Sequence, residues 1–158
     1  MQNETTELTD ILTPELVLVR AGSGQRLANY IIDLVTFYVV IFLLAIVITI
    51  FSPSTIVDAE AGWLGSPIVG RIFYLFLYAL YMSGVEAIFK GKTLGKLITR
   101  TRAVNFDGSK ISTGTAFARG FSRAVPFNPL SALGSPCIPW HDKWTDTVVI
   151  DEKESQLL

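Results

Sequence analysis

Two long apolar runs constrain this chain more than any other feature of its sequence. The first covers residues 30–51 (YIIDLVTFYVVIFLLAIVITIF) and the second covers residues 68–89 (IVGRIFYLFLYALYMSGVEAIF). At about 1.5 Å per residue, a helix of either length reaches about 33 Å, which is enough to cross a hydrocarbon core of about 30 Å. A buried helix of a soluble protein is usually shorter and more amphipathic. The runs therefore predict two transmembrane helices.

The rest of the composition excludes several other classes of protein. A 29-residue acidic segment precedes the first run, whereas a cleaved signal peptide begins with a short basic segment. The single cysteine, Cys137, cannot form an internal disulfide, and a zinc cluster needs more than the single histidine, His141. No hydrolase or metalloprotease motif accompanies His141. We therefore expect no enzymatic activity, no cofactor and no bound metal.

The segment GVEAIFKGKTLGK (84–96) contains the Gly-Lys-Thr that ends a phosphate-binding P-loop. That loop needs four residues between its first glycine and the Gly-Lys-Thr, but six residues separate Gly84 from Gly91. The preceding residues are also the end of an apolar run rather than a short strand. We therefore expect no nucleotide at Lys92, and we interpret Lys90 and Lys92 as contacts with anionic lipid head groups.

Charged residues are distributed unequally around the two runs. Residues 52–67 contain Asp58 and Glu60 but no lysine or arginine, whereas residues 90–123 contain eight basic residues and one acidic residue. Short basic loops stay on the cytoplasmic side of a membrane. The asymmetry predicts a multi-pass protein with the loop outside and both termini in the cytoplasm. Anionic lipids explain the basic charges without a nucleic-acid partner.

Residues 90–150 predict a small module on the cytoplasmic face. Asp107-Gly108 lies between alternating apolar residues of segment 102–112, which is typical of a short β-hairpin. Segment 113–125 predicts an amphipathic helix that is too polar to span a membrane. Segment 145–150 (TDTVVI) predicts a short strand, with residues 102–106 as its candidate partner.

The expected fold class is thus an all-α membrane protein, built as a two-span transmembrane helical hairpin with this module attached. The membrane domain covers residues 13–150. We expect disorder in the acidic N-terminus (1–12) and in the tail (151–158).

Several charged residues lie where lipid makes a charge costly. Asp33 is one turn inside the first span, and the spacing of Arg26, Asn29, Asp33 and Thr36 places all four on one helix face. Glu86 lies about as far from the cytoplasmic end of the second span, so the two carboxylates are expected at a similar depth. They could share a proton, hold a cation, or be neutralised by Arg26, Arg119 or Arg123.

A row of small residues on the second span predicts close helix packing. Ala79, Ser83 and Ala87 recur every four residues, and such a ridge lets another helix backbone approach closely. The ridge is a candidate contact for another integral membrane protein or for a second copy of the chain.

The chain resembles a known family. The residues that carry the resemblance are RLANYIID (26–33), GKTLGKLITRTRAVNFDGSKIS (91–112), Arg119 and WHDKWTDTVV (140–149). In this order they are similar to the RDD family of small bacterial integral membrane proteins, named for one arginine and two aspartates. By position these residues are Arg26, Asp33 and Asp142. The resemblance implies a bacterial inner membrane, and it suggests a part in transport, including that of ions.

Two functional hypotheses follow. In the first, the chain is a non-enzymatic subunit or accessory protein whose buried charges specify how its helices pack. In the second, it transports ions or protons as a homo-oligomer that uses Asp33 and Glu86. We favour the first hypothesis.

Overall fold

The computed structural model describes residues 17–155, except for 126–127, 129–130 and 132–137. It is mostly helical, with two long apolar helices and a small two-stranded antiparallel sheet. Residues 1–12, for which the sequence predicts disorder, lie outside the described residues.

The first apolar run lies in helix α2 (Ser23–Phe51), which is seven residues longer at its start than the predicted span. The Gln25 side chain accepts a hydrogen bond from the Gly22 backbone N–H, so the first turn begins before the apolar run. The helix ends just before Pro53, because a proline disfavours helical geometry in the residue that precedes it. Its early start brings Arg26 and Asn29 into the same helix as Asp33.

The second run forms helix α4 (Pro67–Ile88). Both α2 and α4 are long and apolar enough to cross a membrane. The predicted loop between them is itself structured, since it contains helix α3 (Pro53–Ala61) and a 3-10 turn, η1 (Trp63–Gly65). Pro53 and Pro67 each occupy the first turn of a helix, where a missing N–H costs nothing.

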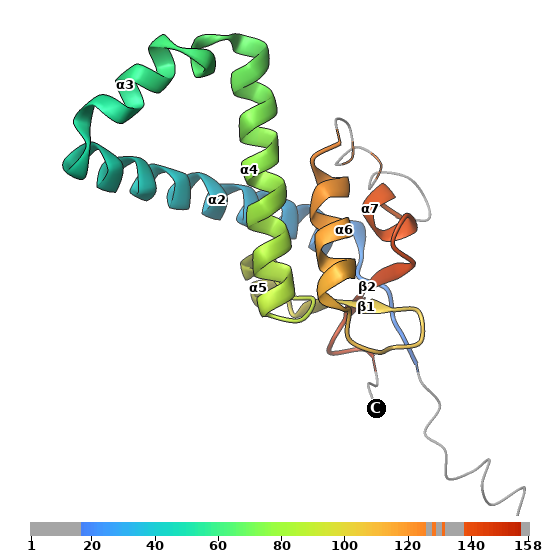
Figure 1. Ribbon diagram of the computed structural model, residues 1–158. Coiled ribbons are helices and arrows are strands. Elements are labelled where there is room, and N and C mark those ends of the chain that lie inside the picture. The colour runs from blue at the N-terminus through green and yellow to red at the C-terminus, as the bar shows by residue number, and fades with distance from the viewer. Residues whose placement is uncertain (1–16, 126–127, 129–130, 132–137, 156–158) are drawn as a thin grey trace, which may run out of the picture.

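The two long helices meet at one place and then diverge. Phe37 of α2 packs edge-on against Tyr78 of α4, with ring centroids 5.3 Å apart, and Met82 completes this small cluster. Beyond it the helices separate, and α3 connects their far ends so that the three helices outline a triangle (Figure 1). The near ends of α2 and α4 lie against the module.

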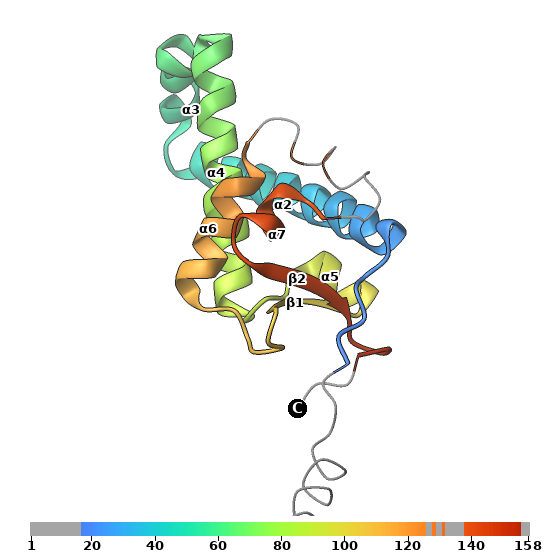
Figure 2. The ribbon, with the colours of Figure 1, turned by 90° about the vertical axis from the view of Figure 1, so that its right-hand side faces the viewer.

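The module begins with helix α5 (Leu94–Thr99), which packs on α2. Strand β1 (Thr101–Asn105) follows and pairs with β2 (Thr147–Asp151), in the register that joins Ala103 to Val149. Figure 2 shows this two-stranded ribbon beside α5, with the later helices on its other side. The predicted pairing of segment 145–150 with residues 102–106 is confirmed.

Two short helices complete the module. Helix α6 (Thr113–Arg123) begins at Ser112, whose side chain accepts a hydrogen bond from the Thr115 N–H at 3.0 Å. It buries one face against α4, as its amphipathic sequence predicts. Helix α7 (Trp140–Lys143) precedes β2.

Two boundaries of the prediction are wrong. The Asp107-Gly108 turn forms, but after it only Lys110 pairs with β1, through an isolated bridge to Val104. The predicted hairpin over 102–112 therefore lacks a second strand. Residues 151–155 do not belong to a disordered tail. Asp151 ends β2, and the Ser155 side chain accepts a hydrogen bond from the Val19 N–H at 2.9 Å.

Candidate functional site

Charged residues from five elements converge where α2 and α4 approach the module. On α2, the predicted polar face is buried at Arg26, Asn29 and Asp33, which expose 8%, 6% and 4% of their surface. Thr36, the fourth residue of that pattern, is half-buried and donates to the Ile32 carbonyl of its own helix. The same region contains Glu86 of α4, Lys96 of α5, Arg119 and Arg123 of α6, and Asp142 of α7. We call these residues, with Arg26 and Asp33, the buried charge cluster.

Asp142 occupies the part of the cluster nearest the sheet. Arg26 Nη1 lies 2.5 Å from one Asp142 oxygen, and Arg119 Nη1 lies 2.7 Å from the other. Arg26 also donates to the backbone carbonyls of Ala21 and Val149. These contacts connect α2, α6 and α7, and the pair of Arg26 and Asp142 joins residues 116 positions apart in the chain.

Glu86 is surrounded by three cations. Its Oε1 accepts hydrogen bonds from Lys96 Nζ and from Arg119 Nε, the latter at 3.3 Å, and Arg123 Nη2 lies 3.5 Å away. Glu86 and Arg119 are completely buried, and Lys96 is 2% exposed. Arg119 therefore bridges the two carboxylates, Glu86 and Asp142.

The electrostatics of the module residues follow from this arrangement. Burial disfavours ionisation of Asp142, but the attraction of the Arg119 and Arg26 guanidinium groups outweighs it and lowers the Asp142 pKa. Burial acts against the charge of Arg119 as well, yet Glu86 and Asp142 raise its pKa.

Two other module residues lose their protons more easily than usual. Burial lowers the pKa of Lys96 to about 8, although the Glu86 carboxylate acts in the opposite direction. Burial also lowers the pKa of His141 well below its usual value, so this imidazole is neutral at pH 7. Asn128 Oδ1 lies 3.1 Å from His141 Nδ1.

Asp33 is held by neutral donors rather than by an arginine. The Thr93 hydroxyl donates to Oδ2 at 2.7 Å, and the Gly95 backbone N–H donates to Oδ1 at 2.8 Å. Among the described residues Asp33 has no ion pair, and it shares no hydrogen bond with Glu86. The predicted neutralisation by arginine thus applies to Glu86 and not to Asp33. The carboxylate fixes the start of α5 against α2, as acidic groups do at helix N-termini.

The contacts of the Gly-Lys-Thr segment explain its composition without a nucleotide. Gly91 has φ +94°, and a Cβ there would lie 2.2 Å from the Ala103 carbonyl oxygen. Gly95 faces α2, where a Cβ would lie 2.6 Å from the Asn29 carbonyl oxygen. Lys92, the P-loop lysine by sequence, forms a partly exposed ion pair with Glu152 at 2.8 Å. Lys92 thus has a partner within the chain, whereas Lys90 is exposed, and the contact of both with lipid head groups stays a prediction.

The ridge of small residues on α4 is covered by the chain's own helix α6. Ala79 and Ser83 are completely buried. A Cβ on Gly120 of α6 would lie 2.0 Å from Ser83 Oγ and 2.8 Å from the Ala79 carbonyl oxygen. Ala87 packs against the core of the module. The prediction that a foreign helix uses this ridge is therefore wrong, because a glycine-containing helix of the same chain already occupies it.

The predicted site residues thus come together in part. Arg26, Glu86, Arg119, Arg123 and Asp142 form one connected network, and Asp33 joins it only through α5. Sequence reasoning missed Lys96, Thr93 and Gly95. Their signal was available in the segment KTLGK (92–96), since threonine is a favoured N-cap residue and Thr93 caps α5, but the surrounding basic residues suggested a surface.

No group of three or more His, Cys, Asp or Glu side chains that could hold a metal ion occurs among the described residues. The single cysteine, Cys137, lies outside the described residues.

Comparison with known proteins gives one match. Residues 20–146, most of the chain, match the RDD family model. No curated protein and no solved structure matches the chain.

Proposed function

Because this chain belongs to the RDD family of membrane proteins, we propose that it is a non-enzymatic subunit or accessory protein that packs against other membrane helices. Its location in this proposal is a bacterial inner membrane. Helices α2 and α4 are the two spans, residues 13–150 form the membrane domain, and both termini lie in the cytoplasm.

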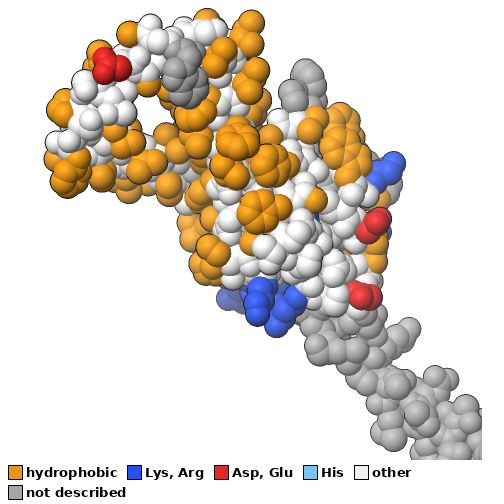
Figure 3. All heavy atoms as spheres, in the orientation of Figure 1, with side chains coloured by type: hydrophobic (Ala, Val, Ile, Leu, Met, Phe, Trp, Pro, Cys, Tyr) orange, Lys and Arg blue, Asp and Glu red, His pale blue; other side chains and the backbone are white. Residues whose placement is uncertain are grey.

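The orientation is supported by charges at the two ends of the molecule. Acidic Asp58 and Glu60 lie on α3, at the far end of the long helices. Exposed basic residues, including Lys90, Arg100 and Lys110, lie at the module end. Figure 3 shows acidic atoms beside α3, apolar side chains along the long helices, and a basic group at the opposite end, where some acidic atoms also lie to one side. Basic residues stay on the cytoplasmic side.

The observation that carries the packing proposal is the open triangle between α2, α3 and α4. No residue of α2 after Phe37 is buried, and apolar side chains such as Phe42 (66% exposed) and Ile50 (69%) face outward. The space-filling view leaves an opening inside the triangle (Figure 3). In a membrane this opening must be filled, and the exposed apolar side chains of α2 suit an apolar helix of another integral membrane protein. The proposed contact is therefore this outer part of α2, which replaces the covered ridge.

The buried charge cluster supports a structural role for the charges. Both Asp142 oxygens have arginine partners, and Glu86 has three cations around one oxygen. Replacement of one member would leave its partner buried without compensation, which strongly destabilises a protein. Such a network specifies one packing of the two spans on the module.

Photocrosslinking in native membranes tests the proposed contact. We would place p-benzoylphenylalanine at Phe42 on α2 and, as a matched control, at Ile98 on α5, which is equally apolar and exposed. The proposal predicts an adduct with a different membrane protein at position 42 and none at position 98. Adducts with lipid alone at both positions would contradict it, and an adduct with a second copy would favour the alternative below.

The alternative is ion or proton transport by a homo-oligomer, and one observation favours it. Asp33 lines a cavity of about 360 Å³ and has no cationic partner among the described residues. Because three cations already surround Glu86, its carboxylate is poorly suited to take up a further proton or cation. In this alternative, the Asp33→Asn variant accumulates normally but loses any pH- or sodium-dependent phenotype. In the favoured proposal, no such phenotype depends on Asp33.

The orientation has its own test. In a Cys137→Ser background, single cysteines at Ser54 on α3 and at Ser109 after β1 are both exposed. A membrane-impermeant maleimide applied to spheroplasts should label position 54 and spare position 109. Labelling of position 109 alone would reverse the orientation.

A further inference from the structure

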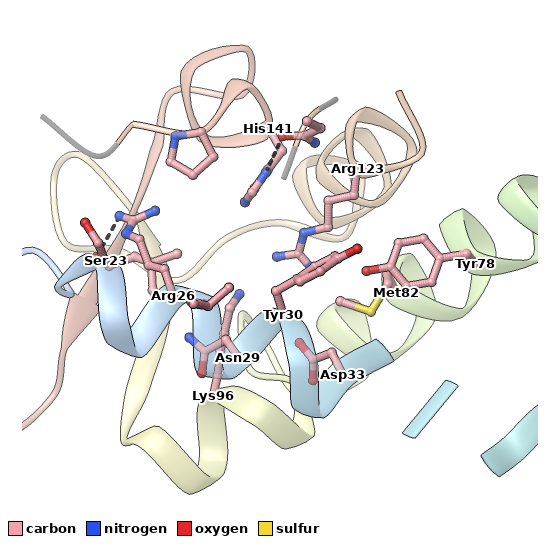
Figure 4. A pocket seen from close by; sticks show the side chains of 14 residues that line it. Ser23, Arg26, Asn29, Tyr30, Asp33, Tyr78, Met82, Lys96, Arg123 and His141 are labelled. Carbon is pink, nitrogen blue, oxygen red and sulfur yellow. Dashed lines mark hydrogen bonds between the residues drawn. The ribbon is translucent and has the colours of Figure 1, made fainter. Parts of the chain in front are cut away.

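The cavity beside the buried charge cluster has two chemically different sides (Figure 4). Its polar side includes Asn29, His141, the cations Arg26, Lys96 and Arg123, and the Asp33 carboxylate. Its other side is formed by Leu27, Tyr30, Tyr78 and Met82. Leu27 and Tyr30 of α2 are 52% and 37% exposed, so the cavity reaches the surface beside α2. A volume of about 360 Å³ is within the range of small-molecule sites.

The charges around this cavity do not cancel. The cluster contains four cations, Arg26, Lys96, Arg119 and Arg123, and three carboxylates, Asp33, Glu86 and Asp142. With every carboxylate ionised, one positive charge remains. Because a buried excess charge is costly, a ligand that supplies one negative charge is stabilised there.

Arg123 is the cation that such a ligand would meet. It has the longest of the ion pairs to Glu86, at 3.5 Å, and its Nη1 is buried without a hydrogen-bond partner among the described residues. Its side chain lines the cavity and is 11% exposed. Figure 4 shows the guanidinium pointing into the cavity, toward Tyr30. An unsatisfied buried donor costs stability, and an acceptor in the cavity would remove this cost.

We propose that this cavity binds the phosphate group of an anionic phospholipid, with Arg123 Nη1 donating to a phosphate oxygen. The phosphodiester of such a lipid supplies the single negative charge, and guanidinium groups bind phosphate oxygens well. The acyl chains leave the cavity past Leu27 and Tyr30, along the exposed apolar face of α2. This phosphate site is separate from the outer part of α2, where the proposed partner helix packs. The lipid proposal and the partner proposal can therefore fail independently.

Native mass spectrometry of the full chain in maltoside detergent tests this inference. The protein would be offered phosphatidylglycerol and phosphatidylcholine together, and inorganic phosphate in a separate arm. Arg123→Gln removes the proposed donor, while Lys143→Gln removes one exposed module cation outside the cavity. Leu27→Trp narrows the opening and leaves every charge in place, which keeps the test decisive if Arg123→Gln does not fold.

The proposal predicts preferential retention of phosphatidylglycerol, weakened about tenfold in Arg123→Gln and unchanged in Lys143→Gln. Leu27→Trp should weaken retention as well. Displacement of the lipid by inorganic phosphate would support phosphate recognition and identify free phosphate as a second source. Equal retention of the two lipids would overturn the proposal. So would equal losses in Arg123→Gln and Lys143→Gln, or unchanged retention in Leu27→Trp.

Discussion

Gly120 of α6 lies against α4 with no room for a side chain, so Gly120→Ala should destabilise the protein. The added Cβ would lie 2.0 Å from Ser83 Oγ, 2.8 Å from Ser83 N and 2.8 Å from the Ala79 carbonyl oxygen. The Ser83 hydroxyl can rotate away, but the two backbone atoms cannot. Helix α6 must therefore move outward from α4, and Arg119 moves with it away from Glu86.

The magnitude of this effect can be estimated from its parts. Overpacking costs about 1–3 kcal/mol, and a weakened hydrogen bond between charged groups adds about 1.5–3 kcal/mol. The higher helix propensity of alanine returns about 1 kcal/mol. The net loss of about 1.5–5 kcal/mol lowers Tm by about 3–20 °C for a chain of this size.

Thermal unfolding in detergent, followed by circular dichroism, measures this loss. Gly84→Ala is the matched control, because it lies on α4 near Ser83 and its Cβ would meet nothing within 4 Å. We expect its Tm to stay the same or rise slightly. Equal Tm values for Gly120→Ala and Gly84→Ala would refute the close packing of α6 on the ridge.

Three further outcomes are expected. Gly95→Ala places a Cβ 2.6 Å from the Asn29 carbonyl oxygen, so α5 should separate from α2 and Tm should fall by several degrees; an unchanged Tm would contradict this contact. Asp142→Asn should cost about 3–5 kcal/mol at pH 7. Folding lowers the Asp142 pKa, so the carboxylate stabilises the fold above its unfolded pKa of about 4, and this stabilisation is lost as the pH falls below that value. Chemical denaturation should therefore show a smaller difference in the free energy of unfolding between Asp142→Asn and the wild type at pH 3 than at pH 7. Lys92→Ala should cost less than about 1 kcal/mol, since its ion pair with Glu152 is partly exposed, and calorimetric titration should detect no ATP binding before or after the substitution.

The elements that the sequence predicted well have local signals. The length of the apolar runs identified α2 and α4, and the amphipathic pattern of segment 113–125 identified α6. The strand pair was also predictable, because the Asp107-Gly108 turn follows the first segment and the second, TDTVVI, is rich in β-branched residues. Helix α3 was missed although Pro53 marks its start, since a short helix in a loop has little periodicity.

The partners of the charged residues could not be predicted in the same way. Arg26 pairs with Asp142, 116 positions away, and no local pattern specifies such a contact. Lys96 follows Lys90 and Lys92 in a basic segment, which suggested a surface position. It is buried because Gly91 turns the chain back and Gly95 lets α5 approach α2 closely. The occupant of the ridge was missed for a related reason, because the sequence shows that Ala79 and Ser83 permit close packing but not which helix provides it.

A double-mutant cycle on Lys96 and Glu86 tests the central claim most directly, namely that the buried charges stabilise the fold by compensating one another. The variants are Glu86→Gln, Lys96→Met and the combination, and the free energy of unfolding in detergent is measured for each. Our account predicts that each single substitution is destabilising and that the double variant loses less than their sum, with a coupling energy of about 1–3 kcal/mol. Strictly additive losses, or single variants as stable as the wild type, would contradict it.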